Sequence, residues 1–583
     1  MDHRVEPAPP EAGQGEGKRR RPRSVAAATS IALLAALPAL VSAVVLLVSR
    51  QDSFLPFGDH AVLHLSVRDV GRERVLLGPY SRFGFYHPGP LAAYLLSVPY
   101  RLLGGAHESL SIGALVINAA SLGGIATVVH RRLGTTVALW TITVLAVTIR
   151  LVEPGFLRDS WNPMLPILPF LLAVLLGWAA LCGELWALPL AVVPASLAVQ
   201  SHVGYLAPVG AAMAVVSIGL LVRVVRQRST GVVRGARGRR RLVALLLTGA
   251  LGALVWLPPV IQQMTDDRGN AEQLLRYFRN ASPHSSMAAG LRSVADELAK
   301  VPAYVLGVDP PDSVLLPQRW PTWAVAIGVA ALVGAVVLAA LRRRGDVVWL
   351  AALSGAVGLA GVAAVARIEG YPFLYVTRWT VVIGALAWTT VGAAVLPAVG
   401  AWLDRAADRS AWVRRPAAAI TVVVAVLACG STAVATAGSA SADTPQTDYS
   451  GDLSLLIGAV HRDLLDNGIL RSDGSSDVVV VEFAATTRAD LVGTSFTGSG
   501  LVLGLVEKGA DVQVSPYWEM PFGSRLTERV ADARYLATIA YADGTSPPPK
   551  PGQRVLAVSG QYEVYGGMLA PPPMPGASNE PAR

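Results

Sequence analysis

Long apolar runs recur along most of the chain and are separated by short polar segments. A helix needs about 20 consecutive apolar residues to cross a bilayer, so runs of this length predict membrane-spanning helices. The first run is too long for the apolar region of a signal peptide, and we interpret it as a retained first span. The predicted spans cover residues 24–49, 109–130, 134–152, 161–181, 185–201, 203–222, 242–263, 321–341, 347–366, 375–399 and 416–438.

A shorter apolar segment, His87 to Gly104, is interrupted by three prolines and predicts a helix lying in the membrane interface. If this segment does not cross and the N-terminus is cytoplasmic, nearly every basic cluster falls on the cytoplasmic side, as the positive-inside rule requires. These clusters lie in residues 1–23, 130–132, 223–241, 342–346 and 404–415. The pattern therefore predicts a multi-pass protein of the cytoplasmic (plasma) membrane with a cytoplasmic N-terminus.

Three long polar segments then lie outside the membrane. They are the first outer loop 50–105, the outer loop 265–319 with two helical stretches, and everything after residue 438. The last segment combines a helical pattern at 452–467 with strand patterns at 478–483, 510–514 and 554–560. Helices alternating with strands predict a small extracytoplasmic α/β domain.

The predicted architecture is an all-α polytopic membrane protein of about eleven transmembrane helices with a small C-terminal extracytoplasmic α/β domain. Its parts are a disordered basic N-terminus at 1–23, a transmembrane domain at 24–438, the α/β domain at 439–565 and a disordered Pro-rich tail at 566–583.

Composition agrees with the membrane class. Hydrophobic residues make up 52% of the 583 residues and charged residues 15%, whereas soluble proteins carry roughly 25% charge. The formal net charge of +9 is explained by basic loops facing anionic lipid, so no nucleic-acid partner is needed. The two cysteines, Cys182 and Cys429, lie in or beside apolar runs, which excludes a disulfide framework or a thiolate metal cage.

The first outer loop carries the densest chemistry. Asp59 follows the first span closely, and a carboxylate held there suits a general base that takes the proton of an acceptor hydroxyl. His60 is a second polar contact, and Asp59 with His60 are the residues that would hold a divalent metal if one is used. No other cofactor is indicated.

Further polar residues gather at the outer ends of the spans. Arg82 and His87 have the donors to hold a phosphate group. Asp159 is the candidate for a second acid near Asp59. His202, in a tight turn between two spans, and Arg378 are further candidates for binding the substrate.

The motifs GDHAVLHL, GPYSRFGFYHPGP, DSWNP and QSHVGY, together with the topology over residues 24–400, resemble the GT-C superfamily of membrane glycosyltransferases. That superfamily includes the RgtA/B/C/D-like transferases and the aminoarabinose transferases of lipid A, and the motifs are similar to those of a set of actinobacterial-type membrane proteins. The resemblance implies inverting transfer of a hexose or pentose from a polyprenyl-phosphate donor to a cell-envelope glycan, lipid or protein.

The same resemblance places the catalytic acid at Asp59 and a second acid at Asp159. Several relatives carry two adjacent acids where this chain has Asp59-His60, which leaves one carboxylate for the base role. Two other hypotheses stay open: a transporter or flippase for a lipid-linked glycan, and a non-catalytic membrane scaffold for wall assembly. A transporter should carry ionisable residues in mid-span, whereas here they gather at span ends.

Overall fold

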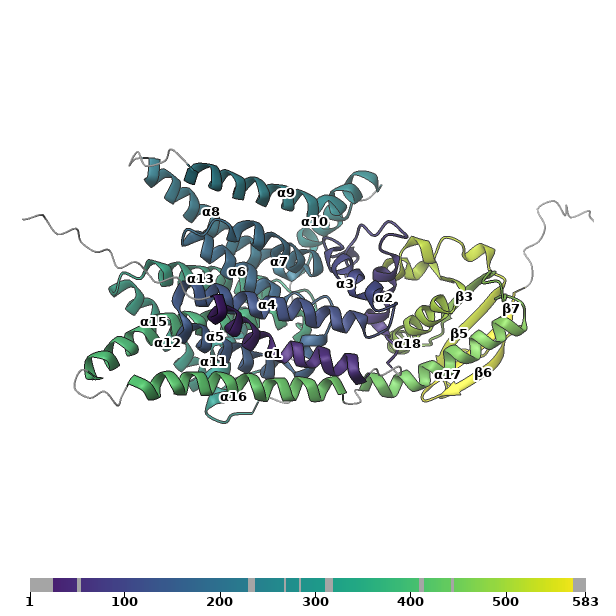
Figure 1. Ribbon diagram of the computed structural model, residues 1–583. Coiled ribbons are helices and arrows are strands. Elements are labelled where there is room, and N and C mark those ends of the chain that lie inside the picture. The colour runs from purple at the N-terminus through teal and green to yellow at the C-terminus, as the bar shows by residue number, and fades with distance from the viewer. Residues whose placement is uncertain are drawn as a thin grey trace, which may run out of the picture.

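The computed structural model describes residues 25–49, 54–228, 236–266, 269–282, 285–309, 318–407, 414–441 and 445–569 (Figure 1). The predicted N-terminal segment 1–23 and most of the predicted tail 566–583 lie outside these residues.

Each of the eleven predicted spans is a helix in the structure. Ten helices among the described residues are long and apolar enough to cross a membrane; one of these, α18 (Arg488–Glu507), packs on the C-terminal sheet instead. The shorter α6 and α7 complete the bundle. The span helices are α1 (Val25–Ser49), α4 (Ser109–Leu133), α5 (Thr135–Val152), α6 (Ile167–Leu181), α7 (Ala187–Ser201), α8 (Leu206–Arg228), α9 (Ala236–Thr265), α12 (Thr322–Leu341), α13 (Gly345–Ala366), α15 (Val381–Ala407) and α16 (Arg414–Ser441). The protein is thus a multi-pass membrane protein.

Basic segments that we predicted to share one side of the membrane meet at one end of the bundle. Arg132 at the end of α4 forms an ion pair with Glu184 at 3.0 Å. Arg223 of α8 donates a hydrogen bond to the carbonyl of Leu181 at the end of α6. Figure 1 shows this end opposite the C-terminal domain.

Two short helices and a hairpin occupy the first loop. They are α2 (Gly58–Asp69), the strands β1 (Tyr80–Ser81) and β2 (Phe85–Tyr86), and α3 (Leu91–Leu102). With 12 residues α3 is about 18 Å long, too short to cross a hydrocarbon core of about 30 Å, and it packs against α2, α4 and α7. As predicted, the segment 87–104 is a helix that does not form a span.

The loop 265–319 contains α10 (Asn270–Asn280) and α11 (Met287–Val305), matching the two predicted helical stretches. The structure adds that α11 is packed between α12, α13 and α15. Glycines make this approach possible: a Cβ on Gly328 would lie 2.4 Å from the carbonyl oxygen of Leu298, and one on Gly384 would lie 2.6 Å from that of Glu297.

The C-terminal domain is a five-stranded mixed sheet covered on one face by α17 (Pro445–Asp466) and α18. Strand order is β4-β3-β5-β7-β6; β3 runs parallel to β4 and β5, while β7 is antiparallel to β5 and β6. The strands are β3 (Val478–Phe483), β4 (Asp511–Val514), β5 (Tyr535–Tyr541), β6 (Arg554–Ser559) and β7 (Tyr562–Met568). The predicted all-α membrane part with a C-terminal α/β domain is therefore confirmed.

Two strands of this sheet were not predicted. β5 and β7 pair along their whole length, from Tyr535 opposite Met568 to Tyr541 opposite Tyr562. Residues 566–568, which we assigned to the disordered tail, belong to β7 because this pairing holds their backbone. Short helices η4 (Pro516–Trp518) and α19 (Glu519–Phe522) follow β4.

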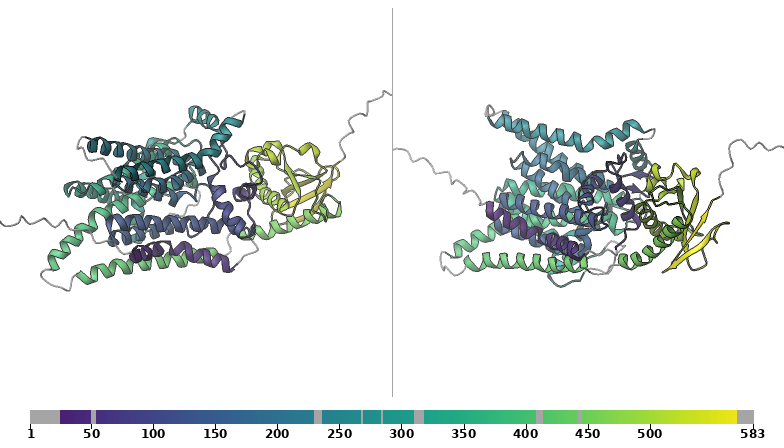
Figure 2. Two further views of the ribbon diagram at one scale, coloured as in Figure 1. Left: turned by 45° about the horizontal axis from the view of Figure 1, so that its top comes forward. Right: turned by 45° about the vertical axis from the view of Figure 1, so that its right-hand side comes forward.

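Helix α2 joins the α/β domain to the membrane bundle. Ala61 and Leu65 on one side of α2 are buried in the core of the α/β domain, whereas Leu63 and Val67 on the other side pack with α3 and α4. The hydroxyl of Ser499 in α18 donates to the carbonyl of Gly58 at 3.2 Å. Figure 2 shows the domain seated at one end of the bundle from two further directions.

A cluster of two histidines and a glutamate forms a second contact between these parts. Glu507 ends α18, where a carboxylate is disfavoured by the helix dipole. His107, between α3 and α4, meets it at 2.8 Å, and the fully buried His64 of α2 lies 3.6 Å away. The charges of Arg68 and Glu108 also face the cluster. Charge on His107 therefore strengthens the docking of α18.

This contact predicts a loss of stability at alkaline pH. Burial alone would lower the pKa of His107, but the hydrogen bond and charge of Glu507 raise it above its ordinary value of 6.5. Because the pKa of His107 is higher in the folded than in the unfolded protein, the charged ring stabilises the folded state fully below about pH 6.5. This stabilisation is lost as the pH rises through the folded-state pKa. We expect the midpoint temperature of thermal unfolding, measured for the protein in lipid nanodiscs, to fall by about 1–3 °C between pH 6.5 and 8.5.

The variant Glu507→Gln should unfold with a flatter pH dependence over the same range. Burial lowers the pKa of His64 to about 4, so the titration of His64 changes the stability only at pH values below 6.5. It therefore does not contribute to the pH dependence between pH 6.5 and 8.5. A pH dependence that stays the same in Glu507→Gln would exclude the ion pair as its source.

Candidate active site

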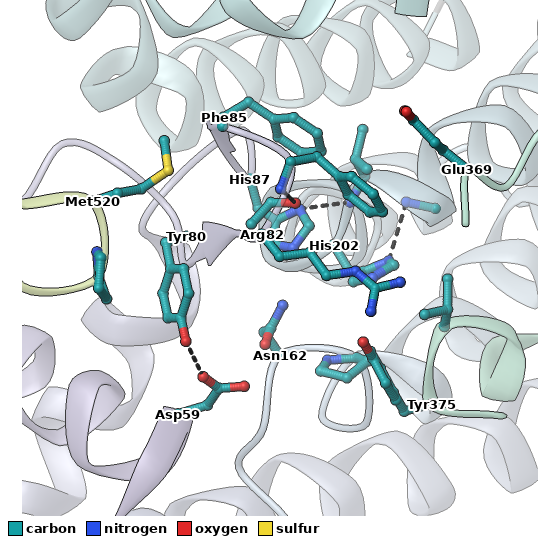
Figure 3. Close-up of a pocket in the computed structure, with 18 of the residues that line it drawn as sticks. Asp59, Tyr80, Arg82, Phe85, His87, Asn162, His202, Glu369, Tyr375 and Met520 are labelled. Carbon is teal, nitrogen blue, oxygen red and sulfur yellow. Dashed lines mark hydrogen bonds between the residues drawn. The ribbon is translucent and has the colours of Figure 1, made fainter. Parts of the chain in front are cut away.

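A cavity of about 1140 Å³ lies between the membrane bundle and the α/β domain. One wall consists of the first loop and of residues at the ends of α8 and α13; the opposite wall comes from α18 and the segment 517–522. Four of the predicted site residues line it, namely Asp59, Arg82, His87 and His202 (Figure 3). The structure thus brings residues from the first loop and from the α7–α8 turn to a common cavity.

Asp59 stands in the first turn of α2 at the edge of this cavity. One carboxylate oxygen accepts a hydrogen bond from the hydroxyl of Tyr80 at 2.5 Å, and the other accepts one from the indole Nε1 of Trp161 at 3.0 Å. The preceding Gly58 has φ +58°, and a Cβ there would lie 2.5 Å from the ring of Phe496. The glycine therefore lets the α/β domain approach the acid closely while two donors fix its orientation.

His60, the residue that follows Asp59 in the chain, forms an ion pair with Asp159. His60 Nε2 lies 3.0 Å from Asp159 Oδ1, and the same oxygen accepts the backbone N–H of Trp161 at 2.8 Å. Burial alone would lower the pKa of His60, but the hydrogen bond and charge of Asp159, with the charge of Asp59, raise it above its ordinary value. Trp161 thus connects the two acids through its indole and its backbone.

Two buried histidines form another part of the cavity wall. His87 Nδ1 accepts the backbone N–H of Val203, and His202 Nδ1 accepts that of Gly204, each at 3.1 Å. Their rings lie 4.7 Å apart. Burial lowers the pKa of His202 to about 4, and burial with the charge of His202 lowers that of His87 well below 6.5. Both rings are therefore neutral at pH 7 and carry their proton on Nε2 as hydrogen-bond donors.

Arg82 is an exposed cation in the cavity. Its guanidinium lies over the rings of Phe83 at 4.8 Å and Phe373 at 5.2 Å, contacts that fix a cation without neutralising it. Figure 3 shows its side chain between the two histidines and Tyr375. A cation beside two neutral N–H donors is suited to bind a phosphate group.

Arg378 occupies a different place from the other candidates. It is buried, its Nε has no hydrogen-bond partner among the described residues, and it interacts electrostatically with Glu153 and Glu297. It does not line the cavity in the part of the chain that the structure describes. In this structure its electrostatic partners are one half-buried acid, Glu153, and one buried acid, Glu297.

The residues proposed for a metal do not present a shared ligand set. His60 directs Nε2 at Asp159, while both oxygens of Asp59 are engaged by Tyr80 and Trp161. No group of three or more His, Cys, Asp or Glu suited to a metal ion occurs among the described residues.

Several residues that line the cavity were given no role in the site by the sequence analysis. Tyr80 and Trp161 lie within the motifs but received no role, because their contacts with Asp59 bridge 21 and 102 residues. Arg367 follows α13, and Arg488 begins α18. Nothing in the sequence indicates that the α/β domain contributes a wall of the site.

Replacing Tyr80 tests whether the orientation of Asp59 matters. Tyr80→Phe keeps the ring and removes the donated hydrogen bond; burial and the charge of Asp59 raise the pKa of Tyr80 well above 10, so this donor persists across the usable pH range. For an enzyme using Asp59, we expect kcat to fall about tenfold with little change in KM, as loss of about 1.4 kcal/mol implies. An equal fall of kcat in Tyr304→Phe, which does not line the cavity, would point to a general loss of folding.

No protein-family model matches this chain, and no curated protein matches it. Among solved structures it is similar to ArnT from Cupriavidus metallidurans. The structure bound to undecaprenyl phosphate is 14% identical with a TM-score of 0.48, over 91% of this chain and 97% of that one. The apo structure is 13% identical with a TM-score of 0.47, over 93% and 98%.

Proposed function

We propose that this protein is a membrane glycosyltransferase that moves a hexose or pentose from a polyprenyl-phosphate donor to a cell-envelope acceptor. The observation that carries the proposal is the placement of Asp59. Its carboxylate is oriented by Tyr80 and Trp161 at the edge of a large cavity. The same cavity is lined by the exposed Arg82 and by two neutral histidines that can donate hydrogen bonds.

The reaction follows from these roles. The acceptor hydroxyl gives its proton to Asp59 while its oxygen attacks the anomeric carbon of the donor sugar. The bond between this carbon and the phosphate oxygen breaks as the new bond forms, and the electron pair leaves with the polyprenyl phosphate. Arg82 and the N–H groups of His87 and His202 stabilise the negative charge that develops on the phosphate.

The position of the cavity supports a lipid-linked donor. Leu206 and Ala207 at the start of α8, with Ala363 and Ala364 at the end of α13, contribute to its lining. The polyprenyl chain of such a donor would lie among the lipid chains, and its phosphate at the membrane surface would then reach the cavity between the ends of α8 and α13. A soluble nucleotide-sugar donor would gain nothing from walls built by span ends.

The orientation follows from charge. The basic segments meet at the end of the bundle that lies away from the cavity, and such segments favour the cytoplasm. The N-terminus is accordingly cytoplasmic, and the cavity and the α/β domain face the outside of the plasma membrane. There the acceptor is a glycan, lipid or protein of the envelope.

A transfer assay tests the proposal. The full-length protein is reconstituted in liposomes with a synthetic polyprenyl-phosphate hexose or pentose, labelled in the sugar, and an envelope fraction is added as acceptor. We expect label to appear in the acceptor fraction together with an equal amount of free polyprenyl phosphate. Asp532→Asn, an exposed position outside the cavity, is the control variant and should retain full activity.

Two outcomes would contradict the proposal. Movement of the intact labelled lipid across the bilayer without release of polyprenyl phosphate would identify a flippase. Absence of both movement and release with hexose and pentose donors, in a protein that is folded, would favour a scaffold.

A further inference from the structure

The cavity is large, and its two walls are built differently. Pockets of about 300–1,000 Å³ enclose a ligand of drug size, whereas this cavity measures about 1140 Å³. Asp59 lines this cavity. Figure 3 shows Arg82 and the two histidines on one side of Tyr80 and Met520 of the α/β domain on the other, with Asp59 below Tyr80.

The wall from the α/β domain exposes large aromatic side chains. Tyr517 is 76% exposed and Phe496 is 44% exposed, although both line the cavity. Trp518 is held in place by Phe483, with ring centroids 5.1 Å apart, and Tyr517 stands edge-on to it at 5.2 Å. Exposed apolar side chains that line a concave surface indicate a binding site.

The same wall carries a cation of its own. Arg488 is exposed at the start of α18 and forms no ion pair with any acidic residue that the structure describes. The positive end of the α18 dipole adds to its potential. Arg82 and Arg488 therefore place positive charge on both walls of the cavity that Asp59 also lines.

We propose that this second wall, made of Arg488, Phe496, Tyr517 and Trp518, binds the acceptor, and that the acceptor is a carbohydrate bearing an acidic group. The inference rests on the proposed function and names the substrate class of its second site. The C–H groups on the face of a sugar ring carry partial positive charge and stack on the negative face of an aromatic ring. Arg488 pairs with the carboxylate or phosphate of the glycan through its two parallel N–H groups.

This arrangement assigns each wall to one substrate. The donor phosphate lies at Arg82, and the acceptor lies at the α/β domain with its hydroxyl directed at Asp59. Because Ser499 and Phe496 of α18 contact Gly58, the helix that would hold the acceptor also positions the base. The α/β domain is then part of the substrate site.

A binding experiment tests the assignment without relying on turnover. Full-length protein in nanodiscs is titrated with tetragalacturonic acid, with its neutral methyl ester and with a phosphorylated tetrasaccharide, using tryptophan fluorescence or saturation-transfer NMR. We expect at least one acidic probe to bind more tightly than the neutral ester. Arg488→Gln should weaken that probe about tenfold and leave the ester unchanged, since about 1.4 kcal/mol of charge-assisted bonding is lost.

Tyr517→Ala should weaken acidic and neutral probes alike, because it removes a stacking surface and no charge. Arg534→Gln, an exposed arginine of the same domain outside the cavity, is the matched control and should change nothing. Which acidic probe binds better decides between carboxylate and phosphate.

Two results would overturn the inference: equal binding of neutral and acidic probes, including no binding of either, or loss of binding in Arg534→Gln equal to that in Arg488→Gln. Binding of undecaprenyl phosphate is measured in parallel. It should be unaffected by Arg488→Gln and weakened by Arg82→Met, so failure of the acceptor site remains distinguishable from failure of the donor site and of the proposed function.

Discussion

Asp59→Asn should lower the transfer rate by about 10²–10⁴-fold, the range that a general base contributes. The amide keeps the size of the side chain but cannot take a proton from the acceptor hydroxyl. Its one oxygen also cannot serve both Tyr80 and Trp161, which donate to separate carboxylate oxygens. The rate is measured as release of polyprenyl phosphate by the reconstituted protein.

Asp59→Asn should also lower the free energy of unfolding, by about 1–3 kcal/mol, because one donor is left unpaired. The double variant Asp59→Asn with Trp161→Phe removes that unpaired donor and should recover stability without recovering the rate. Binding of undecaprenyl phosphate should persist in both variants. A folded Asp59→Asn protein that turns over at the wild-type rate would remove Asp59 from the reaction.

Arg82→Met should lower the transfer rate by about 10²–10³-fold, because a fixed donor to the developing phosphate charge is removed. Methionine keeps an apolar stem that can still contact Phe83 and Phe373, so the loop should stay in place. We also expect weaker binding of undecaprenyl phosphate, measured in nanodiscs. Arg82→Lys keeps the charge without the planar fork and should recover part of the rate.

The control for this change is Arg276→Met on α10. Arg276 forms an ion pair with Glu272 at 2.8 Å and lies outside the main cavity, so its loss should leave rate and lipid binding unchanged. If Arg82→Met binds undecaprenyl phosphate as tightly as the wild type, the donor phosphate must be held elsewhere, and Arg367 would be the next residue to examine.

The helix α2 is an element to which the sequence analysis gave no bounds. Leu63, Leu65 and Val67 alternate with polar residues, a pattern with the period of a strand. In the structure the segment is a helix because it lies between two cores: Ala61 and Leu65 enter the α/β domain, and the other two apolar residues pack with α3 and α4. A helix buried on two sides has no single apolar stripe, so its periodicity does not reveal it.

Strands β5 and β7 were missed for a related reason. β7 contains Gly566 and Gly567, which weaken a strand signal, and its position is fixed by pairing with β5. β3, by contrast, is a run of four valines ending in Glu482 and Phe483, and this buried central strand is evident from the sequence.

The sequence by itself determined the membrane spans, the basic loops between them and the loop in which Asp59, Arg82 and His87 gather. Those features follow from local apolar length and charge, which the bilayer selects independently of the fold. Only the tertiary structure decided that Trp161 connects Asp59 to Asp159, that Arg378 does not line the cavity among the described residues, and that the α/β domain completes the cavity. Asp59 and Trp161, for example, are 102 positions apart in the chain, and no local pattern encodes which distant side chains will meet.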